Sequence, residues 1–450
     1  MKNVRETAFQ ILYKVLEEGE YSHLVLARVL KEEADAEKRD RAFVTHLVEA
    51  TLEHRITIDY VLGKMSKTPL KKMKPVIRTI LRMSVCQMMY MDSVPDAAVC
   101  NEAVKLAKAK GFQGLSGFVN GVLRNVARME GAWKEEAFYR ESGMECVKYF
   151  SVRYSMPEWL CDYFVSEYGE HTAELILKGS GRNPKTTIRC NTSRIAEDEL
   201  IERLLHQGFC VEKGAYAKGA WYLSGYDTLD KIPEFREGLF QVQDESSMLV
   251  AELAGLKKGD LVVDVCSAPG GKALHAANLL TECGGGHVIA RDVSERKTAL
   301  IKENALRLQA DNVTIQVKNA LESDEALIEK ADVVIADLPC SGIGIMAKKP
   351  EIRYRVRPED QKELVQLQKQ MLSVVHRYVK PGGILMYSTC TINKEENEEN
   401  AKEICEKYGF VPELRKECLP EALRGDSEFL QLLPGVHACD GFFIARLRKR

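Results

Sequence analysis

The feature that most constrains the fold is an alternation of short, β-branched apolar runs with helical stretches from about residue 241 onward. Strands that alternate with helices form right-handed βαβ units, which build a parallel, doubly wound sheet. The last two runs predict an antiparallel hairpin with a short connection at one edge. The predicted strands are Leu261–Cys266, His287–Asp292, Val313–Lys318, Ala331–Leu338, Gly383–Thr389, Gly409–Glu413 and Gly441–Leu447.

Two further regions precede this sheet. Residues 1–130 carry apolar side chains at helical spacing and predict an all-α bundle. Residues 131–240 contain one predicted strand, Thr186–Cys190, flanked by predicted helices, and indicate a small α/β module. We therefore expect three domains, 1–130, 131–240 and 241–450, a division that suits a chain of 450 residues.

Composition excludes several classes of protein. The net charge of -2 gives no global basis for nucleic-acid binding, so any RNA affinity must come from local basic patches. The N-terminus has no apolar signal core, and no apolar run approaches the length that spans a bilayer. The 13 cysteines include no CxxC pair, and there is no HExxH motif or Cys/His cluster. We expect a cytoplasmic monomer that uses neither a membrane nor a metal ion.

One basic stretch lies in the helical region. Between Tyr60 and Met91 there is no acidic residue. Such a run is either a solvated helical face or a surface that contacts RNA phosphates, where each neutralised phosphate releases counterions. Both interpretations stay open on the sequence alone. The seven bases are Lys64, Lys67, Lys71, Lys72, Lys74, Arg78 and Arg82.

Polar residues at the ends of the first three predicted strands indicate a nucleoside site. In a doubly wound sheet, ligands bind beyond the carboxyl ends of the strands. Gly270 and Gly271 follow the first strand and let a ligand approach the start of a helix. Asp292 ends the second strand, where a carboxylate accepts hydrogen bonds from ribose hydroxyls, and Asn319 follows the third, where an amide can address adenine. The absence of Walker and GxGxxG spacings favours an adenosine site without a pyrophosphate clamp.

Two cysteines follow the next two strands. Cys340 lies in Asp337-Leu-Pro-Cys340, and Cys390 ends Tyr387-Ser-Thr-Cys390, so both face the same edge of the sheet. Cytosine C5 is a poor nucleophile, and a thiolate that adds to C6 makes it electron-rich enough to accept a methyl group from a sulfonium donor. Asp337 is placed to hold the N3/N4 edge of the ring. A helix predicted to begin near Asn393 favours ionisation of Cys390, whereas four nearby glutamates oppose it.

These motifs resemble those of the NOL1/NOP2/Sun family of RNA cytosine-5 methyltransferases, in which a DxCAAPGGKT loop, a DxPCSG turn and a YSTC turn occur in this order. Here they are Asp264–Ala273, Asp337–Gly342 and Tyr387–Cys390. Residues 243–247 resemble the family's entry into the catalytic domain, and Arg5–Asn125 resembles a NusB-type RNA-binding domain. The arrangement over nearly the whole chain is similar to bacterial 16S ribosomal RNA methyltransferases of the Sun/Fmu type.

The resemblance implies a fold, a reaction and a set of site residues. The fold is a NusB-like bundle, a small α/β module and a Rossmann-like class I methyltransferase with a mostly parallel seven-stranded sheet. The reaction is S-adenosylmethionine-dependent methylation of cytosine C5 in 16S ribosomal RNA, with cytosine 967 as the family's target. Cys390 would be the nucleophile, Cys340 the thiol that assists release, and Asp337 the third catalytic residue. Cofactor contacts would come from Cys266, Ser267, Ala268, Pro269, Gly270, Gly271, Lys272, Asp292, Asn319 and Asp337.

The chain departs from the family pattern in three places. Ser267 and Ala273 replace the usual Ala and Thr of the loop, and Asn319 stands where the family commonly has Asp. An amide offers a donor as well as an acceptor, so the geometry of its adenine contact would change. A basic segment, Lys348–Arg357, follows the Pro-Cys turn, and we expect it to contact RNA phosphates while the target base is unstacked.

Three alternatives remain. Methylation of an exocyclic amine typically uses an Asn/Asp-Pro-Pro-aromatic turn, which Asp337-Leu-Pro-Cys340 does not match. A non-catalytic NusB-like RNA-binding or ribosome assembly factor would be expected to lose Cys390 or the Gly-Gly turn, and both are present. The two thiols would exchange roles if the chain followed DNA cytosine methyltransferases, in which a Pro-Cys cysteine attacks; the Tyr387–Cys390 motif favours the RNA arrangement.

Overall fold

The computed structural model describes residues 3–33, 36–140, 143–181 and 185–450. The chain divides into two compact units. The first combines residues 1–181 with the short segment Lys349–Arg355, and the second combines residues 182–348 with residues 356–450. The all-helical prediction for the N-terminal region is confirmed, as is the mostly parallel sheet of the C-terminal region.

The first unit is built around α5 (Pro75–Tyr90), which is the most buried of its helices. Pro75 occupies the first turn, where its missing N–H costs nothing. The other helices pack against α5 directly or against neighbouring parts of the same unit. They are α1 (Val4–Leu16), α2 (Ser22–Glu32), α3 (Lys38–Glu53), α4 (Arg55–Met65), α6 (Asp96–Ala109), α7 (Ser116–Ala127), α8 (Glu136–Tyr139), α9 (Cys146–Tyr154), α10 (Glu158–Ser180) and α16 (Ile352–Arg355).

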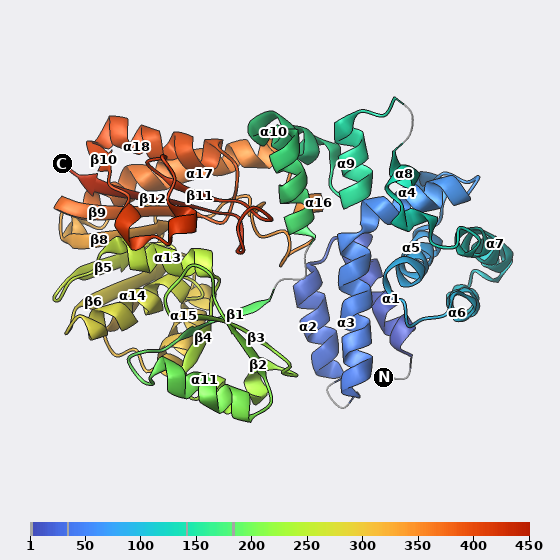
Figure 1. Cartoon of the computed structure of the whole chain (residues 1–450), viewed down its shortest axis with the longest axis horizontal. Coiled ribbons are helices and arrows are strands. Elements are labelled where there is room, and N and C mark those ends of the chain that lie inside the picture. Colours follow the sequence, from blue (N-terminus) through green and yellow to red (C-terminus); the bar gives the residue numbers. More distant parts are fainter. Residues whose placement is uncertain (1–2, 34–35, 141–142, 182–184) are drawn as a thin grey trace. The chain divides into compact units, whose positions relative to one another are not determined.

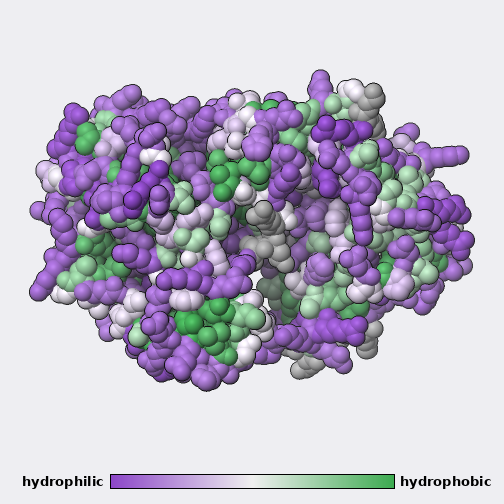
Figure 2. Space-filling model, in the orientation of Figure 1, coloured by the Kyte–Doolittle hydropathy of each residue, from purple (hydrophilic) through white to green (hydrophobic). Residues whose placement is uncertain are grey.

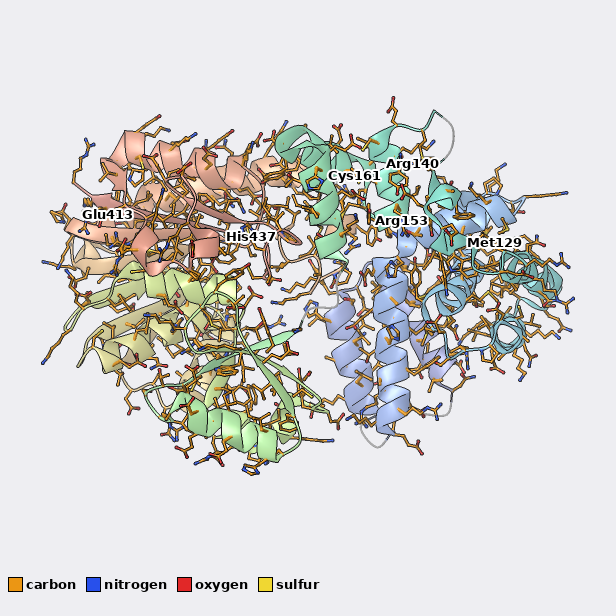
Figure 3. All side chains as sticks on the ribbon, viewed as in Figure 1. Met129, Arg140, Arg153, Cys161, Glu413 and His437 are labelled. Carbon is orange, nitrogen blue, oxygen red and sulfur yellow. The ribbon has the colours of Figure 1, made fainter. Side chains whose placement is uncertain are left out.

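Arginine–aromatic contacts join α8 and α9. The guanidinium of Arg153 lies 5.2 Å from the centre of the Tyr139 ring, and that of Arg140 lies 4.6 Å from the Tyr149 ring. Both arginines are labelled in Figure 3. Such contacts attract a cation to the face of an aromatic ring. They attach the short helix α8 to its neighbour, although α8 has only four residues of its own.

The segment Lys349–Arg355 packs within the first unit, although it lies far along the chain. Arg353 is only 1% exposed and donates to the carbonyl oxygens of Glu53 (3.3 Å) and Ser180 (3.1 Å). Arg355 donates to the carbonyl of Gly19 at 3.1 Å. The predicted phosphate contact by this basic segment is therefore wrong for Arg353, because its guanidinium is buried against main-chain oxygens.

The second unit begins with a four-stranded antiparallel sheet in the order β2-β3-β1-β4. Leu200 and Leu204 of the accompanying helix α11 pack on Ile188 and Phe240 of the sheet. This confirms the strand Thr186–Cys190 and adds three strands that periodicity did not reveal. The elements are β1 (Thr186–Cys190), β2 (Cys210–Lys213), β3 (Ala220–Ser224), β4 (Phe240–Val242), α11 (Glu197–His206) and α12 (Pro233–Arg236).

A larger, eight-stranded sheet follows in the order β10-β12-β9-β8-β5-β6-β7, with β11 paired to β12. The five strands from β9 to β7 are mutually parallel, whereas β12 runs antiparallel to β9, β10 and β11. The strands are β5 (Leu261–Asp264), β6 (His287–Asp292), β7 (Val313–Val317), β8 (Ala331–Asp337), β9 (Val379–Thr389), β10 (Phe410–Pro412), β11 (Leu430–Leu432) and β12 (Phe442–Lys449).

Helices cover both faces of this sheet (Figure 1). Adjacent residues of a strand point to opposite faces, so Val262 and Val263 of β5 lie in different apolar clusters. The cluster around Val262 includes residues of α13 (Glu245–Ala254), α14 (Gly271–Glu282) and α15 (Glu295–Leu308). The cluster around Val263 includes residues of α17 (Pro358–Val375) and α18 (Asn400–Tyr408).

The connection between the last two predicted strands differs from the expected short one. The antiparallel pairing of the last two predicted strands is confirmed by β10 and β12, but their short connection is wrong. The chain between them includes β11, which also pairs with β12, so β12 lies inside the sheet.

The visible surface is mostly hydrophilic, with apolar residues in small separate groups (Figure 2). Among the described helices, none is long and apolar enough to cross a bilayer.

Candidate active site

The loop between β5 and α14 is held against the neighbouring strand β6. The Ser267 amide donates to the carbonyl of Arg291 (2.8 Å), and the Ala268 amide donates to Oδ2 of Asp292 (3.0 Å). The Ala268–Pro269 peptide bond is cis. Gly270 has a φ of +104°, which a side chain rarely adopts, and an added Cβ would lie 3.0 Å from Leu274. The loop thus delivers the chain directly into the N-terminus of α14 at Gly271.

Asp264, the last residue of β5, is a buried carboxyl with an unused oxygen. Its Oδ1 accepts from the Cys266 amide at 3.3 Å, whereas Oδ2 is buried without a hydrogen-bond partner among the described residues. Burial, reinforced by the nearby charge of Asp337, raises the pKa of Asp264 to about 7. An orphaned buried acceptor is costly unless a ligand supplies a donor. Asp264 is therefore suited to a ligand that carries an ammonium group.

Lys272 and Asp337 form a partly buried ion pair across the site. Lys272 Nζ lies 2.8 Å from Asp337 Oδ2, and the hydroxyl of Ser388 donates to Asp337 Oδ1 at 2.9 Å. Burial by itself lowers the pKa of Lys272, but the Asp337 carboxylate outweighs this and raises it, so the ammonium keeps its proton. Sequence reasoning assigned Lys272 to the cofactor loop and missed this pairing. Only the juxtaposition of α14 with the end of β8 brings it about.

The two cysteines that follow adjacent parallel strands are in contact. Cys340 Sγ lies 3.3 Å from Cys390 Sγ, and the Gly344 amide donates to the carbonyl of Cys390 at 3.2 Å. The hydrogen bond with Cys390, followed by burial, raises the pKa of Cys340 well above the ordinary value. Cys340 therefore keeps its proton and can donate a hydrogen bond to a Cys390 thiolate. The structure brings together Cys340, Cys390 and Asp337, the residues predicted to be catalytic.

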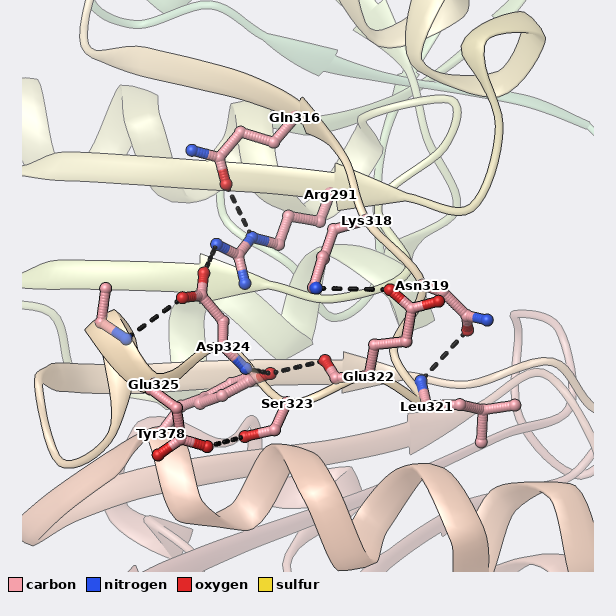
Figure 4. Close-up of polar contacts among 11 residues, drawn as sticks. Arg291, Gln316, Lys318, Asn319, Leu321, Glu322, Ser323, Asp324, Glu325 and Tyr378 are labelled. Carbon is pink, nitrogen blue, oxygen red and sulfur yellow. Dashed lines mark hydrogen bonds and ion pairs between the residues drawn. The ribbon is translucent and has the colours of Figure 1, made fainter.

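Asp292 and Asn319 follow neighbouring parallel strands. Asp292 is buried. Its Oδ2 accepts from the Ala268 amide, and its Oδ1 accepts from the Val293 amide at 2.8 Å. Asn319 Oδ1 accepts from the Leu321 amide at 3.1 Å, which leaves its NH₂ group available as a donor (Figure 4). Val293 is 54% exposed and Leu321 38% exposed. These two apolar side chains, which sequence reasoning missed, are suited to contact a flat ring. Their only sequence signal is their place beside Asp292 and Asn319.

A polar network fixes the loop that carries Asn319. Buried Arg291 donates to Gln316 Oε1 at 2.8 Å and pairs with Asp324, whose pKa is lowered chiefly by that hydrogen bond. The Asp324 amide donates to the hydroxyl of Tyr378 at 3.1 Å (Figure 4). The loop from Lys318 to Glu325 is therefore attached both to β6 and to the chain before β9. This attachment holds Asn319 near Asp292.

The basic stretch of the first unit separates into two parts. Arg78 pairs with Glu17, and Arg82 pairs with Asp59, so both arginines serve internal contacts. The five lysines are exposed and follow one another along the end of α4, the 3-10 turn η1 (Leu70–Lys72) and the start of α5. We refer to them as the lysine cluster: Lys64, Lys67, Lys71, Lys72 and Lys74.

Three family profiles match separate parts of the chain. Residues 251–448 match "16S rRNA methyltransferase RsmB/F", residues 2–128 match the NusB family, and residues 156–226 match the ferredoxin-like domain of RsmF/B-like methyltransferases. The expected division into domains 1–130, 131–240 and 241–450 is not tested by these matches, and we retain it as our proposal.

The chain is similar along its whole length to curated proteins. It is 36% identical to "Probable ribosomal RNA small subunit methyltransferase B" of Bacillus subtilis (strain 168), covering 100% of this chain and 99% of that protein. It is 30% identical to the protein of the same name from Synechocystis sp., covering 100% of both. Among solved structures, "Crystal Structure of PH0851" matches with a TM-score of 0.79 at 25% identity, covering 98% of each chain.

Proposed function

The chain belongs to the ribosomal RNA small subunit methyltransferase B family, and from this premise we propose that it methylates C5 of a cytosine in 16S ribosomal RNA through a covalent bond between Cys390 and C6. The observation that carries this proposal is the contact of two thiols beside a partly buried Lys–Asp pair. An enzyme that methylates an amine has no use for two thiols, because a nitrogen lone pair attacks directly. Methylation of C5 requires an added nucleophile.

Cys390 is the nucleophile of the proposed reaction. The hydrogen bond with Cys390, followed by burial, raises the pKa of Cys340, so the Cys340 thiol stays protonated beside the attacking sulfur. The Cys390 thiolate adds to C6, and the electron pair of the C5–C6 double bond becomes available at C5. After methyl transfer the C5 proton passes to water, the double bond re-forms, and the C6–Sγ electron pair returns to Cys390.

Asp337 and Lys272 act on the ring edge during addition. As C6 is attacked, the electron density of the ring rises at N3 and at the carbonyl oxygen. Asp337 accepts a hydrogen bond from the N4 amino group or from protonated N3, while the Lys272 ammonium stabilises the developing negative charge. Their partial burial strengthens both effects, because partly buried charges are screened less than exposed ones. Ser388 orients the carboxylate from the opposite side.

The residues around the β5–α14 loop fit S-adenosylmethionine, which supplies a sulfonium methyl group when bound. The orphaned Oδ2 of Asp264 suits its ammonium group, and the N-terminus of α14 suits its carboxylate. Asp292 is placed for the ribose, Asn319 for the adenine edge, and Val293 and Leu321 for the adenine faces. Among the other predicted contacts, Cys266 and Lys272 are occupied by internal packing and by Asp337.

RNA binding by the first unit is assigned to the lysine cluster, which is exposed and free of acidic residues in sequence. A NusB-family match over residues 2–128 supports an RNA role for this unit. We retain cytosine 967, the family's target, as the proposed site of methylation, and the monomer as the proposed state.

The deciding experiment uses small-subunit RNA that contains 5-fluorocytosine, together with S-adenosylmethionine. Fluorine at C5 cannot leave as a proton, so the attacking cysteine stays attached to the RNA. We expect a denaturation-resistant adduct with the wild type and with Cys340→Ala, and none with Cys390→Ala. Loss with Cys340→Ala alone would exchange the roles of the thiols. Failure of every variant on RNA that a relative methylates would favour the non-catalytic assembly factor.

A further inference from the structure

The residues that directly follow the two cysteines are hydrogen-bonded to each other. Ser341 Oγ lies 2.7 Å from Thr391 Oγ1, and both side chains are buried. Each hydroxyl is one residue beyond a thiol, so this contact fixes the two loops where they carry the sulfur atoms. The loop of Cys340 is thereby held beside the loop of Cys390.

A buried carboxyl group holds the Cys340 side of this arrangement. Oε2 of Glu396 accepts from the Ser341 amide (2.9 Å) and from Nε2 of Gln368 (3.0 Å). The same Gln368 nitrogen donates to the carbonyl of Pro339 at 2.9 Å. The main chain is therefore held on both sides of Cys340, at Pro339 and at Ser341. The group that holds it belongs to the segment that follows Cys390.

Glu396 is itself fixed in one position. It lies in the π-helical turn η7 (Glu395–Glu399), and its carbonyl accepts from the Tyr387 hydroxyl. Gln368 is oriented by Asn400, whose Nδ2 donates to Gln368 Oε1 at 2.8 Å. The start of the turn is capped by Asn393, which accepts from the Glu395 amide at 2.8 Å. The Glu396 carboxyl is therefore not needed to begin the turn, and its contacts are directed to the Cys340 loop.

The Glu396 side chain is buried and leaves one of its two carboxyl oxygens unused. The residue is 0% exposed, and burial raises the pKa of its carboxyl group. Oε1 has no hydrogen-bond partner among the described residues. A glutamine side chain has the same length, and its amide oxygen can accept the same two N–H groups. A carboxyl group one methylene shorter would not reach the same donors.

We propose that Glu396 is a positioning residue for the release step, in which it holds the Cys340 thiol against Cys390 through Ser341 and Gln368. The inference rests on the proposed roles of the two thiols. During release the C5 proton passes to water, its electron pair forms the C5–C6 double bond, and the C6–Sγ pair returns to Cys390. The Cys340 thiol donates a hydrogen bond to that sulfur as it departs. Without Glu396, addition and methyl transfer continue while release slows.

The first test needs no RNA and uses a reagent whose binding requires that the two thiols be adjacent. Phenylarsine oxide binds two adjacent thiols, forming two As–S bonds and releasing water. We expect Glu396→Asp to bind it at least about tenfold more weakly than the wild type. Glu396→Gln restores binding, and Glu399→Gln, an exposed change in the same turn, leaves it unaltered. Equal binding by Glu396→Asp and the wild type would overturn the proposal.

A second test separates release from addition. On ordinary RNA with S-adenosylmethionine, Glu396→Asp is expected to accumulate the covalent adduct, whereas Glu396→Gln turns over. On 5-fluorocytosine RNA, where release is blocked, all of these variants should be trapped to a similar extent. The idea fails if Glu396→Asp loses trapping together with turnover, because that indicates general damage. If even the wild type is not trapped, the proposed function fails instead, and the arsenical measurement still decides the positioning role.

Discussion

Lys272 Nζ lies 2.8 Å from Asp337 Oδ2 in a partly buried site, although 65 residues separate them in the chain. The Asp337 carboxylate raises the pKa of Lys272 and so keeps its ammonium group protonated. The pair lies beside the two thiols, so the same contact that stabilises the folded site supplies both a hydrogen-bond acceptor and a positive charge for the target ring.

Replacing Asp337 with Asn is expected to reduce methyl transfer by about 10²–10³-fold, because the amide neither pairs with Lys272 nor accepts as strongly from the base. Transfer of labelled methyl groups to small-subunit RNA gives the rate. Asp311→Asn, a change at an exposed carboxylate, is the matched control and should leave the rate unaltered. A rate for Asp337→Asn within about threefold of the wild type would remove Asp337 from the mechanism.

The affinity for cofactor should depend on pH through Asp264. Its pKa is raised to about 7, so only about one-tenth of the groups are ionised at pH 6. A ligand ammonium group requires the ionised form, so S-adenosylhomocysteine should bind roughly tenfold more tightly at pH 8 than at pH 6, with release of a proton near pH 6. Titration calorimetry in two buffers of different ionisation enthalpy measures both quantities. Asp264→Asn should flatten the profile; an unchanged profile would assign it to another group.

The same raised pKa has an opposite effect on the stability of the unliganded protein. Between the ordinary value of 3.8 and about 7, the folded state binds more protons at Asp264 than the unfolded state. This contribution to stability is therefore full below the unfolded pKa and is lost as the pH rises through 7. Urea unfolding of Asp264→Asn should show its gain relative to the wild type increasing from pH 5 to pH 8. A gain that is constant with pH would contradict the assignment.

Arg353 is expected to stabilise the first unit rather than bind RNA. Arg353→Ala removes the donor of the Ser180 carbonyl and one of the two donors of the Glu53 carbonyl, which keeps the Tyr354 hydroxyl, and it opens a cavity, at a cost of about 2–4 kcal/mol. Urea unfolding monitored by circular dichroism gives the change, and Lys349→Ala, at an exposed position of the same segment, is the control. Under conditions in which the Arg353→Ala variant is folded, its affinity for RNA should equal that of the wild type. A loss of affinity without a loss of stability would restore the phosphate contact.

The lysine cluster should determine the salt dependence of RNA binding. Changing Lys71, Lys72 and Lys74 to Gln removes three exposed charges, so the slope of log affinity against log salt should fall by about two. Filter binding from low to moderate salt measures this slope. A triple change at Lys369, Lys402 and Lys407, each paired with a glutamate, is the control. Equal slopes for the two triple variants would show that the lysine cluster is only a solvated surface.

The local sequence pattern predicted helices and strands well where its apolar periodicity was strong. The strand His287–Asp292 has the predicted bounds, and β5, β7 and β8 end one or two residues before the expected positions. Apolar periodicity and β-branching are read from short stretches of sequence, so these signals do not depend on the tertiary contacts of the segment. The strands β2, β3, β4 and β11 were missed because they are short and lack the runs of β-branched residues that mark the equally short β1, β5 and β7.

The positions of the candidate site residues were predictable for a related reason. Cys340, Cys390, Asp292 and Asn319 all follow parallel strands, and the carboxyl ends of such strands must meet at one edge. The partners of these residues were not predictable. Lys348 illustrates the difference, because it was expected to contact RNA but pairs with Asp244 and Asp440, which lie about a hundred residues away on either side.

By itself, the sequence determined the helices and strands whose apolar pattern is strong, the face that each of them buries, and the reactive side chains that reach the edge of the larger sheet. These features depend on spacing along the chain. Only the tertiary structure decided that Lys272 meets Asp337, that the two thiols are in contact, that Glu396 holds the loop of Cys340, and that Arg353 is buried. Such contacts join residues separated by tens to hundreds of positions, and they form because buried polar groups must find partners wherever the packing of apolar faces leaves them.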